Sequence, residues 1–339
     1  MKKVTCISYH GTGSGAVDDL LKEFDNFASG PSEYEFRLLH DPDGISDLEY
    51  NLVDNPHRLN SGYAIKRFEK YCKYLNRNNT KLFGEAWKIC TDKYIDALIK
   101  FRYHAYWQGD LWLFPEYKYY FLKFRRLLAK VSPPAIRKPN YYNYFPKIES
   151  YHVAIDESSF LKLTQRYLEG LCRGLNKENK EYVLLDQAVP TMNIQRYLRY
   201  VKNMKVIIVD RDPRDTYINH QKGKDHVLPK DPEKFAIAYR DYRRTLKMEL
   251  EDKKHVLRIQ FEDLIYNYED TVERIIQFLG TDSSHHINPK TVLKPEVSVK
   301  NTKQWEKLDG YMEAVQIIEE MLPEFLFDFP ENSSKDISE

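Results

Sequence analysis

Residues 206–221 of the chain read VIIVDRDPRDTYINHQ, an apolar run that stops at a cluster of charged side chains. The branched residues of the run are typical of a buried β-strand. A helix is predicted to begin directly behind the strand, because Asp212 can cap it, Pro213 suits its first position and Asp215 falls at its third. The strand therefore delivers Arg211 to its carboxyl edge, next to a helix N-terminus.

Arg211 has two interpretations at this edge. Its planar guanidinium suits a phosphate, and Arg214 and Asn219 on the following helix are expected near the same edge. Alternatively, Arg211 pairs with Asp215 and Arg214 pairs with Asp212, which would be surface ion pairs that contribute little to stability. The segment therefore predicts an anion site, and surface ion pairs remain the alternative.

Other apolar runs along the chain have the length of buried strands. Together with the run that precedes Arg211, the predicted strands are Val4–Tyr9, Tyr34–Leu39, Tyr182–Asp186, Lys205–Asp210 and His255–Gln260. Stretches with helical periodicity follow several of them, most clearly Leu264–Leu279, which Gly280 closes. Strands that alternate with helices indicate βαβ units. We therefore expect an α/β fold with a central, mainly parallel sheet flanked by helices, and ligands at the carboxyl ends of its strands.

The first predicted strand runs into the loop His10-Gly11-Thr12-Gly13-Ser14-Gly15-Ala16. Its glycines let backbone N–H groups turn inward, and a helix N-terminus follows, so the loop can cradle a phosphate or a phosphosulfate. It lacks the lysine of a Walker A loop, but Gly11, Gly13 and Ala16 satisfy the dinucleotide pattern G-x-G-x-x-A. A tight turn without a ligand is the other alternative.

Length and composition limit the classes of protein that fit. The 339 residues include 52 Lys or Arg and 51 Asp or Glu, for a net charge of +1, which argues against a polybasic nucleic-acid-binding protein. Four cysteines without C-x-x-C spacing are typical of reduced thiols rather than of disulfides or a zinc site. The apolar stretch Val4 to Tyr9 is too short for an export signal or a spanning helix. We therefore expect a cytoplasmic protein with no integral membrane segment.

An insertion at roughly residues 85–175 is rich in aromatic side chains. In its segment 101–151, nine basic side chains against three acidic ones give a local charge of +6. Aromatic faces pack on sugar rings and other flat apolar surfaces, and a positive field attracts an acidic acceptor. We expect this Tyr-rich, helical insertion to form the acceptor site of a single domain, 1–330, followed by a disordered tail, 331–339. The alternative is that many of these rings are helix core. The rings are Tyr103, Tyr106, Trp107, Trp112, Tyr117, Tyr119, Tyr120, Tyr141, Tyr142, Tyr144 and Tyr151.

Three segments resemble the sulfotransferases that use 3′-phosphoadenosine-5′-phosphosulfate (PAPS), in their bacterial or cytosolic type. YHGTGSGAV at 9–17 resembles the 5′-phosphosulfate loop, VDRDPRDTYINH at 209–220 the 3′-phosphate motif, and LRIQFEDLIYNYEDTVERIIQFLG at 257–280 a strand–Glu-Asp-Leu–helix segment. The resemblance implies a P-loop-like fold and sulfuryl transfer from PAPS to a hydroxyl. The product would be adenosine 3′,5′-bisphosphate (PAP), and no metal is expected.

SVKNTKQW at 298–305 resembles the last phosphate-binding loop of the same family, although the usual glycine is missing. Two further departures concern the phosphates. The Lys or Arg that the family carries in the first loop is Gly11 here, so positive charge at the leaving phosphate has to come from His10 or a distant lysine. The family serine eight residues after the arginine is Asn219, whose amide can still donate to phosphate. The contacts implied in the last loop are Lys300, Asn301 and Lys303.

Transfer to a hydroxyl also needs a base within hydrogen-bond reach of the acceptor. His40 and Asp41 match the place where carbohydrate-acting members of the family carry a catalytic acidic residue, so one of them is the expected base. Small-molecule members carry a Lys and a His where this chain has Asp186 and Gln187. His220 is a further candidate, and the residues from Asp41 onward could also form only a turn.

Three functions compete at this point. The first is a PAPS-dependent sulfotransferase acting on a glycan or a lipid-like alcohol. The second is a Rossmann-type NAD(P)-dependent oxidoreductase that uses Gly11, Gly13 and Ala16, and it requires an acidic residue at the end of the second strand, where Asp41 stands. The third is a non-catalytic member of the fold that binds nucleotide or glycan, suggested by the missing loop lysine. The sequence RDPRDTY favours the first, because the second leaves it unexplained.

Overall fold

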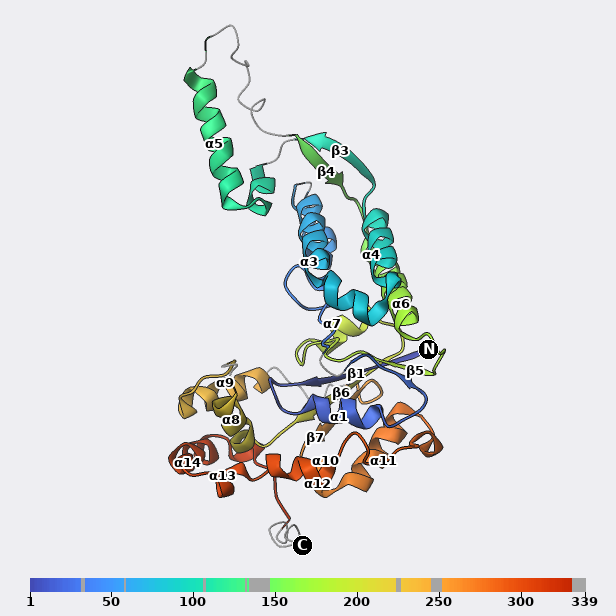
Figure 1. Ribbon diagram of the computed structural model, residues 1–339, viewed down its shortest axis with the longest axis vertical. Coiled ribbons are helices and arrows are strands. Elements are labelled where there is room, and N and C mark those ends of the chain that lie inside the picture. Colours follow the sequence, from blue (N-terminus) through green and yellow to red (C-terminus); the bar gives the residue numbers. More distant parts are fainter. Residues whose placement is uncertain are drawn as a thin grey trace. The chain divides into compact units, whose positions relative to one another are not determined.

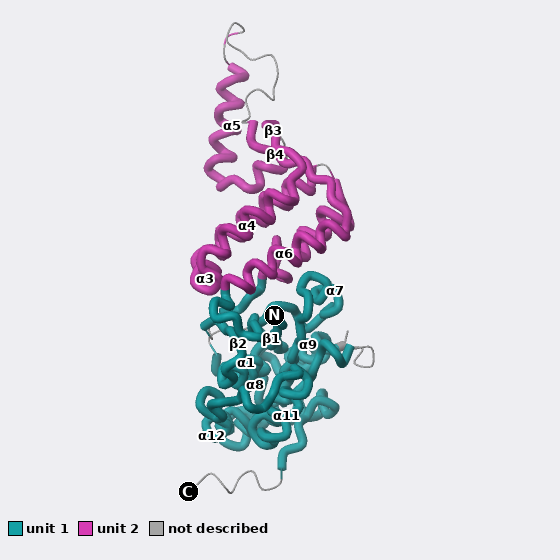
Figure 2. The backbone as a smooth tube through the Cα atoms, turned by 90° about the vertical axis from the view of Figure 1, so that its right-hand side faces the viewer, with its two compact units in different colours: residues 1–37, 175–339 teal, residues 38–174 magenta. Residues whose placement is uncertain are grey.

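The computed structural model describes residues 1–31, 34–57, 59–105, 108–131, 133, 147–223, 227–244 and 252–330. The chain divides into two compact units, coloured separately in Figure 2. Unit 1 combines Met1–Arg37 with Leu175–Glu339, and unit 2 consists of Leu38–Gly174. Unit 2 contains most of the predicted insertion but begins earlier in the chain. The single domain over 1–330 stays a prediction, and the predicted tail lies outside the described residues.

Unit 1 is built on a five-stranded parallel sheet in the order β2-β5-β1-β6-β7 (Figure 1). Consecutive residues in the interiors of β1 and β6 are buried, as expected for a parallel sheet covered on both faces. The predicted α/β fold with a parallel sheet is confirmed, as is every predicted strand except Tyr34–Leu39. The strands are β1 (Lys2–Ser8), β2 (Phe27–Ala28), β5 (Tyr182–Leu184), β6 (Met204–Asp210) and β7 (Val256–Gln260).

Helices flank this sheet, as Figure 1 shows. α1 and α11 bury apolar stripes, including Val17, Leu20 and Ile275, in one core cluster with the strands. α8, α9 and α14 form a second cluster that includes Phe235 and Ile318. The helices are α1 (Ser14–Leu21), α7 (Ile194–Leu198), α8 (Pro213–Lys222), α9 (Pro232–Arg244), α10 (Asp263–Tyr266), α11 (Tyr268–Leu279), α12 (Pro295–Ser298), α13 (Gln304–Lys307) and α14 (Met312–Met321).

The predicted strand Tyr34–Leu39 is wrong. The edge of the sheet beside β5 is taken by the two-residue strand β2 instead. The Phe36 N–H still donates to the carbonyl oxygen of Asp186 at 2.7 Å, but the chain then turns, and the Leu38 carbonyl accepts from the Ile45 N–H at 3.0 Å. The apolar side chains of this segment, Phe36, Leu38 and Leu39, are buried although its backbone forms no strand. Its apolar sequence therefore looked like that of a buried strand.

The predicted helix Leu264–Leu279 is two helices, α10 and α11. Asn267 interrupts it with φ −126° and ψ 43°, outside the helical region, and is the N-terminal cap residue of α11. The apolar pattern continues across this break, so periodicity alone did not locate it. The predicted end is confirmed, because Gly280 is left-handed at φ 69° and its N–H donates to the Ile276 carbonyl oxygen at 2.8 Å.

Unit 2 is mainly helical, which confirms that character for the predicted insertion. β3 and β4 form an antiparallel pair with Phe101 opposite His152. α4 and α6 pack closely: the Tyr94 and Tyr167 rings stack at 4.6 Å between centroids. No helix among the residues that the structure describes is long and apolar enough to cross a bilayer. The elements are α2 (Ile45–Glu49), α3 (Asn60–Phe83), α4 (Glu85–Leu98), β3 (Phe101–Ala105), α5 (Glu116–Val131), β4 (Ile148–His152) and α6 (Glu157–Leu175), with a π-helical turn (Tyr50–Asp54) and a 3₁₀ turn (Gln108–Leu113).

Part of the predicted aromatic acceptor region lies outside the described residues. It comprises Tyr106, Trp107, Tyr141, Tyr142 and Tyr144.

Candidate active site

The loop between β1 and α1 has the conformation that its glycines permit. Gly11 and Gly13 adopt φ +81° and +103°, which disfavours any side chain. A methyl group on Gly13 would come within 2.7 Å of the Phe261 ring, whereas one on Gly15 would meet nothing within 4 Å. The loop therefore needs glycine at position 13 for a close packing contact, and Gly15 lies in open space.

Thr12 ties this loop to the sheet. The fully buried Thr12 hydroxyl accepts from the Tyr9 N–H at 3.0 Å and donates to the Val209 carbonyl oxygen at 2.6 Å. In the described loop, no side chain caps α1, whose N-cap residue is Gly13. The N–H groups of the first helical turn have no partner inside a helix, so a bound anion can accept from them.

Polar side chains from two strands meet at the start of α1. Gln187, just after β5, donates from Nε2 to the Ser14 hydroxyl at 2.7 Å, and that hydroxyl lies 3.2 Å from the Ser8 hydroxyl at the end of β1. The Gln187 backbone is left-handed, with φ +53°. Its side chain thereby reaches the carboxyl edge of the sheet, next to the first loop. The sequence pointed to position 187 through the family resemblance but did not predict the contact of Gln187 with Ser14.

Arg211 lies at the carboxyl end of β6, as predicted, and is only 4% exposed. Its guanidinium stacks 4.7 Å from the centroid of the Phe261 ring, the same ring that packs against Gly13. It donates to the Asn301 carbonyl oxygen, and the Asn219 amide, with its oxygen turned toward Arg211, accepts at 3.0 Å from Nη2. Its Nε has no partner among the described residues. Burial lowers the pKa of Arg211, with Asp215 as the main opposing charge.

The predicted ion pairs form only in part. Arg214 pairs with Asp212 at 2.6 Å between Nη2 and Oδ2, and with Glu319 at 2.8 Å, so the pairing predicted for this arginine forms, although the Asp212 pair is buried rather than at the surface. Asp212 also caps α8 through the Arg214 N–H at 2.8 Å, and Pro213 is first in the helix, as predicted. Among the described residues, no ion pair joins Arg211 to Asp215. Arg211 is therefore the arginine available to an anion.

Asp215 instead holds the last predicted loop. Its carboxylate accepts from the backbone N–H groups of Lys303 at 3.0 Å and Gln304 at 2.9 Å. Lys303 is left-handed at φ +50°, a conformation that favours glycine, at the loop where the family glycine is missing. The structure thus brings Arg211, Asn219, Asn301 and Lys303 together along one side of α8. Lys300, in the adjoining 3₁₀ turn, is exposed.

His220, on α8, occupies the space next to Gly11. Its Nε2 lies 2.7 Å from the His10 carbonyl oxygen, so Nε2 carries the proton. A methyl group on Gly11 would come 3.3 Å from the same nitrogen. The His10 ring packs at 5.1 Å from Tyr242, and burial, then the charges of His220, Arg37 and Arg243, lower the pKa of His10. The His10 side chain is thus disfavoured as a cation, and the His220 ring lies directly against the loop.

Two buried carboxyl groups, Glu262 and Asp215, and the half-buried Asp186 lie near this edge. Burial raises the pKa of Glu262 to about 8, of Asp186 to about 7 and of Asp215 to about 6. Glu262 accepts from the Asp212 N–H at 3.0 Å and so links β7 to the start of α8, which is a structural role. Asp186 follows β5 and precedes Gln187, and its Oδ1 has no partner among the described residues. Of these three groups, Asp186 combines a pKa of about 7 with partial exposure, which suits proton exchange near neutral pH.

His40 and Asp41 belong to unit 2 and follow a turn rather than the end of a strand. The Asp41 carbonyl accepts from the Gly44 N–H at 2.9 Å, so the turn considered from the sequence is present. The Asp41 carboxylate accepts from the Tyr71 hydroxyl at 2.8 Å. Because no strand ends before it, Asp41 does not take the position that a dinucleotide-binding acidic residue requires.

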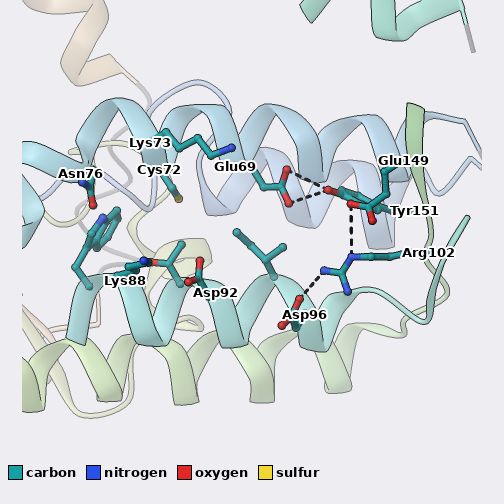
Figure 3. A pocket seen from close by; sticks show the side chains of 13 residues that line it. Glu69, Cys72, Lys73, Asn76, Lys88, Asp92, Asp96, Arg102, Glu149 and Tyr151 are labelled. Carbon is teal, nitrogen blue, oxygen red and sulfur yellow. Dashed lines mark hydrogen bonds and ion pairs between the residues drawn. The ribbon is translucent and has the colours of Figure 1, made fainter. Parts of the chain in front are cut away.

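Unit 2 contains a pocket of about 680 Å³ between α3, α4 and the β3–β4 pair (Figure 3). Glu69 and Lys73 reach it from α3, and Asp92 and Asp96 from α4. The Tyr151 hydroxyl donates to Glu69 at 3.0 Å, and burial raises the pKa of this carboxyl group. The floor is formed by buried side chains and the rim by charged ones, so the pocket suits a polar, hydroxylated ligand. Its floor consists of Cys72, Trp87, Thr91 and Ile95.

Comparisons with known proteins identify the family. A family model for the sulfotransferase domain matches residues 128–309, more than half of the chain. The chain belongs to the sulfotransferase family. The predicted resemblance is confirmed, and the class of activity is that of a sulfotransferase rather than of an oxidoreductase. No curated protein matches the sequence.

Several solved structures are similar at low identity. The sulfotransferase domain from the Synechococcus PCC 7002 olefin synthase is 13% identical, with a TM-score of 0.43, over 97% of this chain and 95% of that one. Retinol dehydratase in complex with androsterone and inactive cofactor PAP is 14% identical, with a TM-score of 0.34, over 97% and 84%. STF1 from Mycobacterium tuberculosis H37Rv is 11% identical, with a TM-score of 0.34, over 90% and 77%.

Proposed function

We propose that this sulfotransferase uses PAPS and transfers its sulfuryl group to a hydroxyl of a glycan or a lipid-like alcohol. The observation that carries the proposal is the Arg211 guanidinium, which is buried at the carboxyl edge of the sheet with its Nε unpartnered among the described residues. A buried N–H group without a partner favours a ligand that can accept from it, and a phosphate accepts while also compensating the charge of the guanidinium. PAPS, when bound, would supply the sulfuryl group and the phosphate that leaves.

The donors on this edge fit the two ends of such a nucleotide. The N–H groups at the start of α1, with Ser14 and Gln187 beside them, would hold the 5′-phosphosulfate. Arg211, Asn219 and the Lys303 side of the last loop would hold the 3′-phosphate, since a guanidinium binds phosphate through paired N–H groups. We include Lys300 and Asn301 as further contacts in this role.

His220 is our candidate for the positive charge that Gly11 cannot provide. Its Nε2–H is engaged by the His10 carbonyl, so a second proton on Nδ1 would place a cation against the loop. The variant His220→Ala should reduce kcat about 10- to 100-fold while PAP affinity changes less than about threefold. His285→Ala, which removes an exposed histidine paired with Asp25, is the control. Unchanged kcat in His220→Ala would remove this assignment.

For the base we keep Asp41 or His40, and we add Asp186 because its pKa of about 7 suits proton transfer. Turnover and PAP affinity measured for Asp41→Ala, His40→Ala and Asp186→Asn decide among them. The base variant loses turnover by about 100-fold or more and keeps its PAP affinity. A variant with unchanged turnover is not the base.

The acceptor class rests on unit 2. Its pocket has charged rims and a Tyr151–Glu69 hydrogen bond, which suit hydroxyl groups, and its aromatic side chains suit sugar rings or an extended apolar alcohol. Carbohydrate sulfation and a cytoplasmic location remain predictions from the sequence.

Transfer of radiolabelled sulfate from PAPS tests the proposal against the non-catalytic alternative, which the absence of a Lys or Arg in the first loop keeps open. Wild-type protein should label at least one acceptor from a panel of oligosaccharides and long-chain alcohols. Arg211→Ala should reduce the labelling about 100-fold, whereas Arg240→Ala, on the outer surface of α9, should not change it. PAP binding without transfer to any acceptor would support the non-catalytic binding protein instead.

A further inference from the structure

Helix α5 (Glu116–Val131) in unit 2 exposes most of its large apolar side chains. Figure 1 shows this helix standing apart from α3, α4 and α6 of the same unit. Leu122 is its buried large side chain, and the others range from 37% exposed at Tyr119 to 76% at Val131. The exposed ones are Tyr117, Tyr119, Tyr120, Phe121, Phe124, Leu127, Leu128 and Val131. A surface helix normally turns such residues toward a core, whereas most of those on α5 are exposed in the part of the chain that the structure describes.

Apart from Tyr119, which lies on the other side of the helix, the exposed apolar residues form one continuous stripe. Proceeding along α5, they recur at intervals of three and four residues, from Tyr117 through Phe124 to Val131. Residues at this spacing share one face of a helix. No charged residue falls within the stripe. An apolar stripe of this kind is hydrated at a cost unless something apolar covers it.

Basic side chains border the stripe on both sides. Lys118 and Arg125, seven residues or two turns apart, line one border, and Lys123 and Lys130, also seven apart, line the other. The Lys123 ammonium lies 5.9 Å from the ring centroid of Tyr120, which belongs to the stripe, and 4.5 Å from that of Tyr119. Glu116, at the first turn, is the single acidic residue of the helix. The partner therefore has to be apolar in its middle and anionic at its borders.

We propose that α5 binds the surface of an anionic lipid bilayer, with its aromatic stripe in the interface and its lysines and arginines among the headgroups. A bilayer interface offers both properties at once, an acyl region for the stripe and phosphates for the two basic borders. With 16 residues, α5 is too short to span the bilayer, and its charged borders fit a helix that lies along the surface. An acidic peptide would satisfy the borders but leave the stripe uncovered. The proposal concerns this surface alone and does not depend on the acceptor.

Sedimentation of the full-length chain with vesicles tests the proposal. The wild type should bind phosphatidylcholine vesicles that contain phosphatidylglycerol, bind pure phosphatidylcholine at least about tenfold more weakly, and lose affinity as salt is raised. Tyr120→Ser/Phe124→Ser should lower binding by about tenfold or more, and Arg125→Glu by several-fold. The matched controls, Tyr74→Ser and Lys162→Glu on other helices of unit 2, should bind like the wild type.

Three results would overturn the proposal. The first is a wild type that does not bind phosphatidylglycerol vesicles at low salt. The second is binding that survives in Tyr120→Ser/Phe124→Ser. The third is light scattering in solution that shows self-association lost in that double variant while no vesicles are bound, which would assign the stripe to a second copy of the chain. Because the altered side chains are exposed, the circular dichroism of each variant should match that of the wild type, which separates loss of binding from loss of folding.

Discussion

The glycines of the first loop differ in what their surroundings allow, although they are only two residues apart. Gly13 combines φ +103° with the Phe261 ring, which stands 2.7 Å from where a methyl group would be, whereas Gly15 has open space. Gly13→Ala should lower the free energy of unfolding by about 2–4 kcal/mol and weaken PAP binding, because the loop and the Phe261 ring must both shift. Gly15→Ala should be neutral or stabilise by up to about 1 kcal/mol, since alanine favours the helix. Denaturant unfolding of the two variants checks the contrast, and equal effects would contradict the loop geometry.

Asp186 should make the stability depend on pH. Its pKa is raised from 3.8 to about 7, so the folded state binds this proton more tightly than the unfolded state. The stability that the proton contributes is complete below pH 3.8 and is lost as the pH rises toward 7. Asp186→Asn should therefore match the wild type near pH 4 and exceed it by about 1–2 kcal/mol at pH 8, an amount reduced for the partial exposure of the group. Thermal unfolding across this range measures the difference, with exposed Asp309→Asn as the control. A constant offset at all pH values would exclude this account.

At the scale of elements, Asp215 connects α8 to the loop at 298–305, which we propose to bind phosphate. Both of its oxygens accept backbone N–H groups, so Asp215→Asn leaves one donor unsatisfied and removes the negative charge near Arg211. The free energy of unfolding should fall by about 1–3 kcal/mol and PAP affinity by about tenfold. Calorimetry of PAP binding measures the second effect. Asp231→Asn at α9 is the control, because asparagine also accepts the Lys234 N–H as a cap. Wild-type affinity in Asp215→Asn would show that the loop does not need this anchor.

The sequence predicted correctly those elements whose signals lie within a few residues of one another. The apolar run before Arg211 and the Asp212–Pro213 start of α8 were predictable, because strand and cap both lie within a few residues. Tyr34–Leu39 was not, since burial there comes with a turn rather than with strand pairing. The approach of His220 to Gly11 joins residues more than 200 positions apart, so spacing could not reveal it. Two features of the sequence could have suggested this contact: the first loop lacks its lysine, and a histidine, His220, stands beside Asn219.

At the scale of the molecule, the chain is a parallel-sheet unit with a mainly helical second unit. The groups we assign to the nucleotide lie on unit 1, at the carboxyl edge of the sheet, where parallel α/β folds bind ligands. The α5 stripe and the polar pocket lie on unit 2. The sequence predicted the sheet and the insertion but not the start of unit 2 at Leu38, because no composition change marks that position.

The measurement that tests the central claim most directly is calorimetric titration of PAP and, separately, of NAD into wild type, Arg211→Ala and the control Arg240→Ala. We predict that PAP binds wild type and Arg240→Ala alike and binds Arg211→Ala about 100-fold more weakly, because the buried guanidinium is lost, while NAD binds none of them. Circular dichroism of Arg211→Ala should match that of the wild type, which separates loss of binding from loss of folding. Equal PAP affinity in Arg211→Ala and wild type, or binding of NAD and not of PAP, would contradict the account.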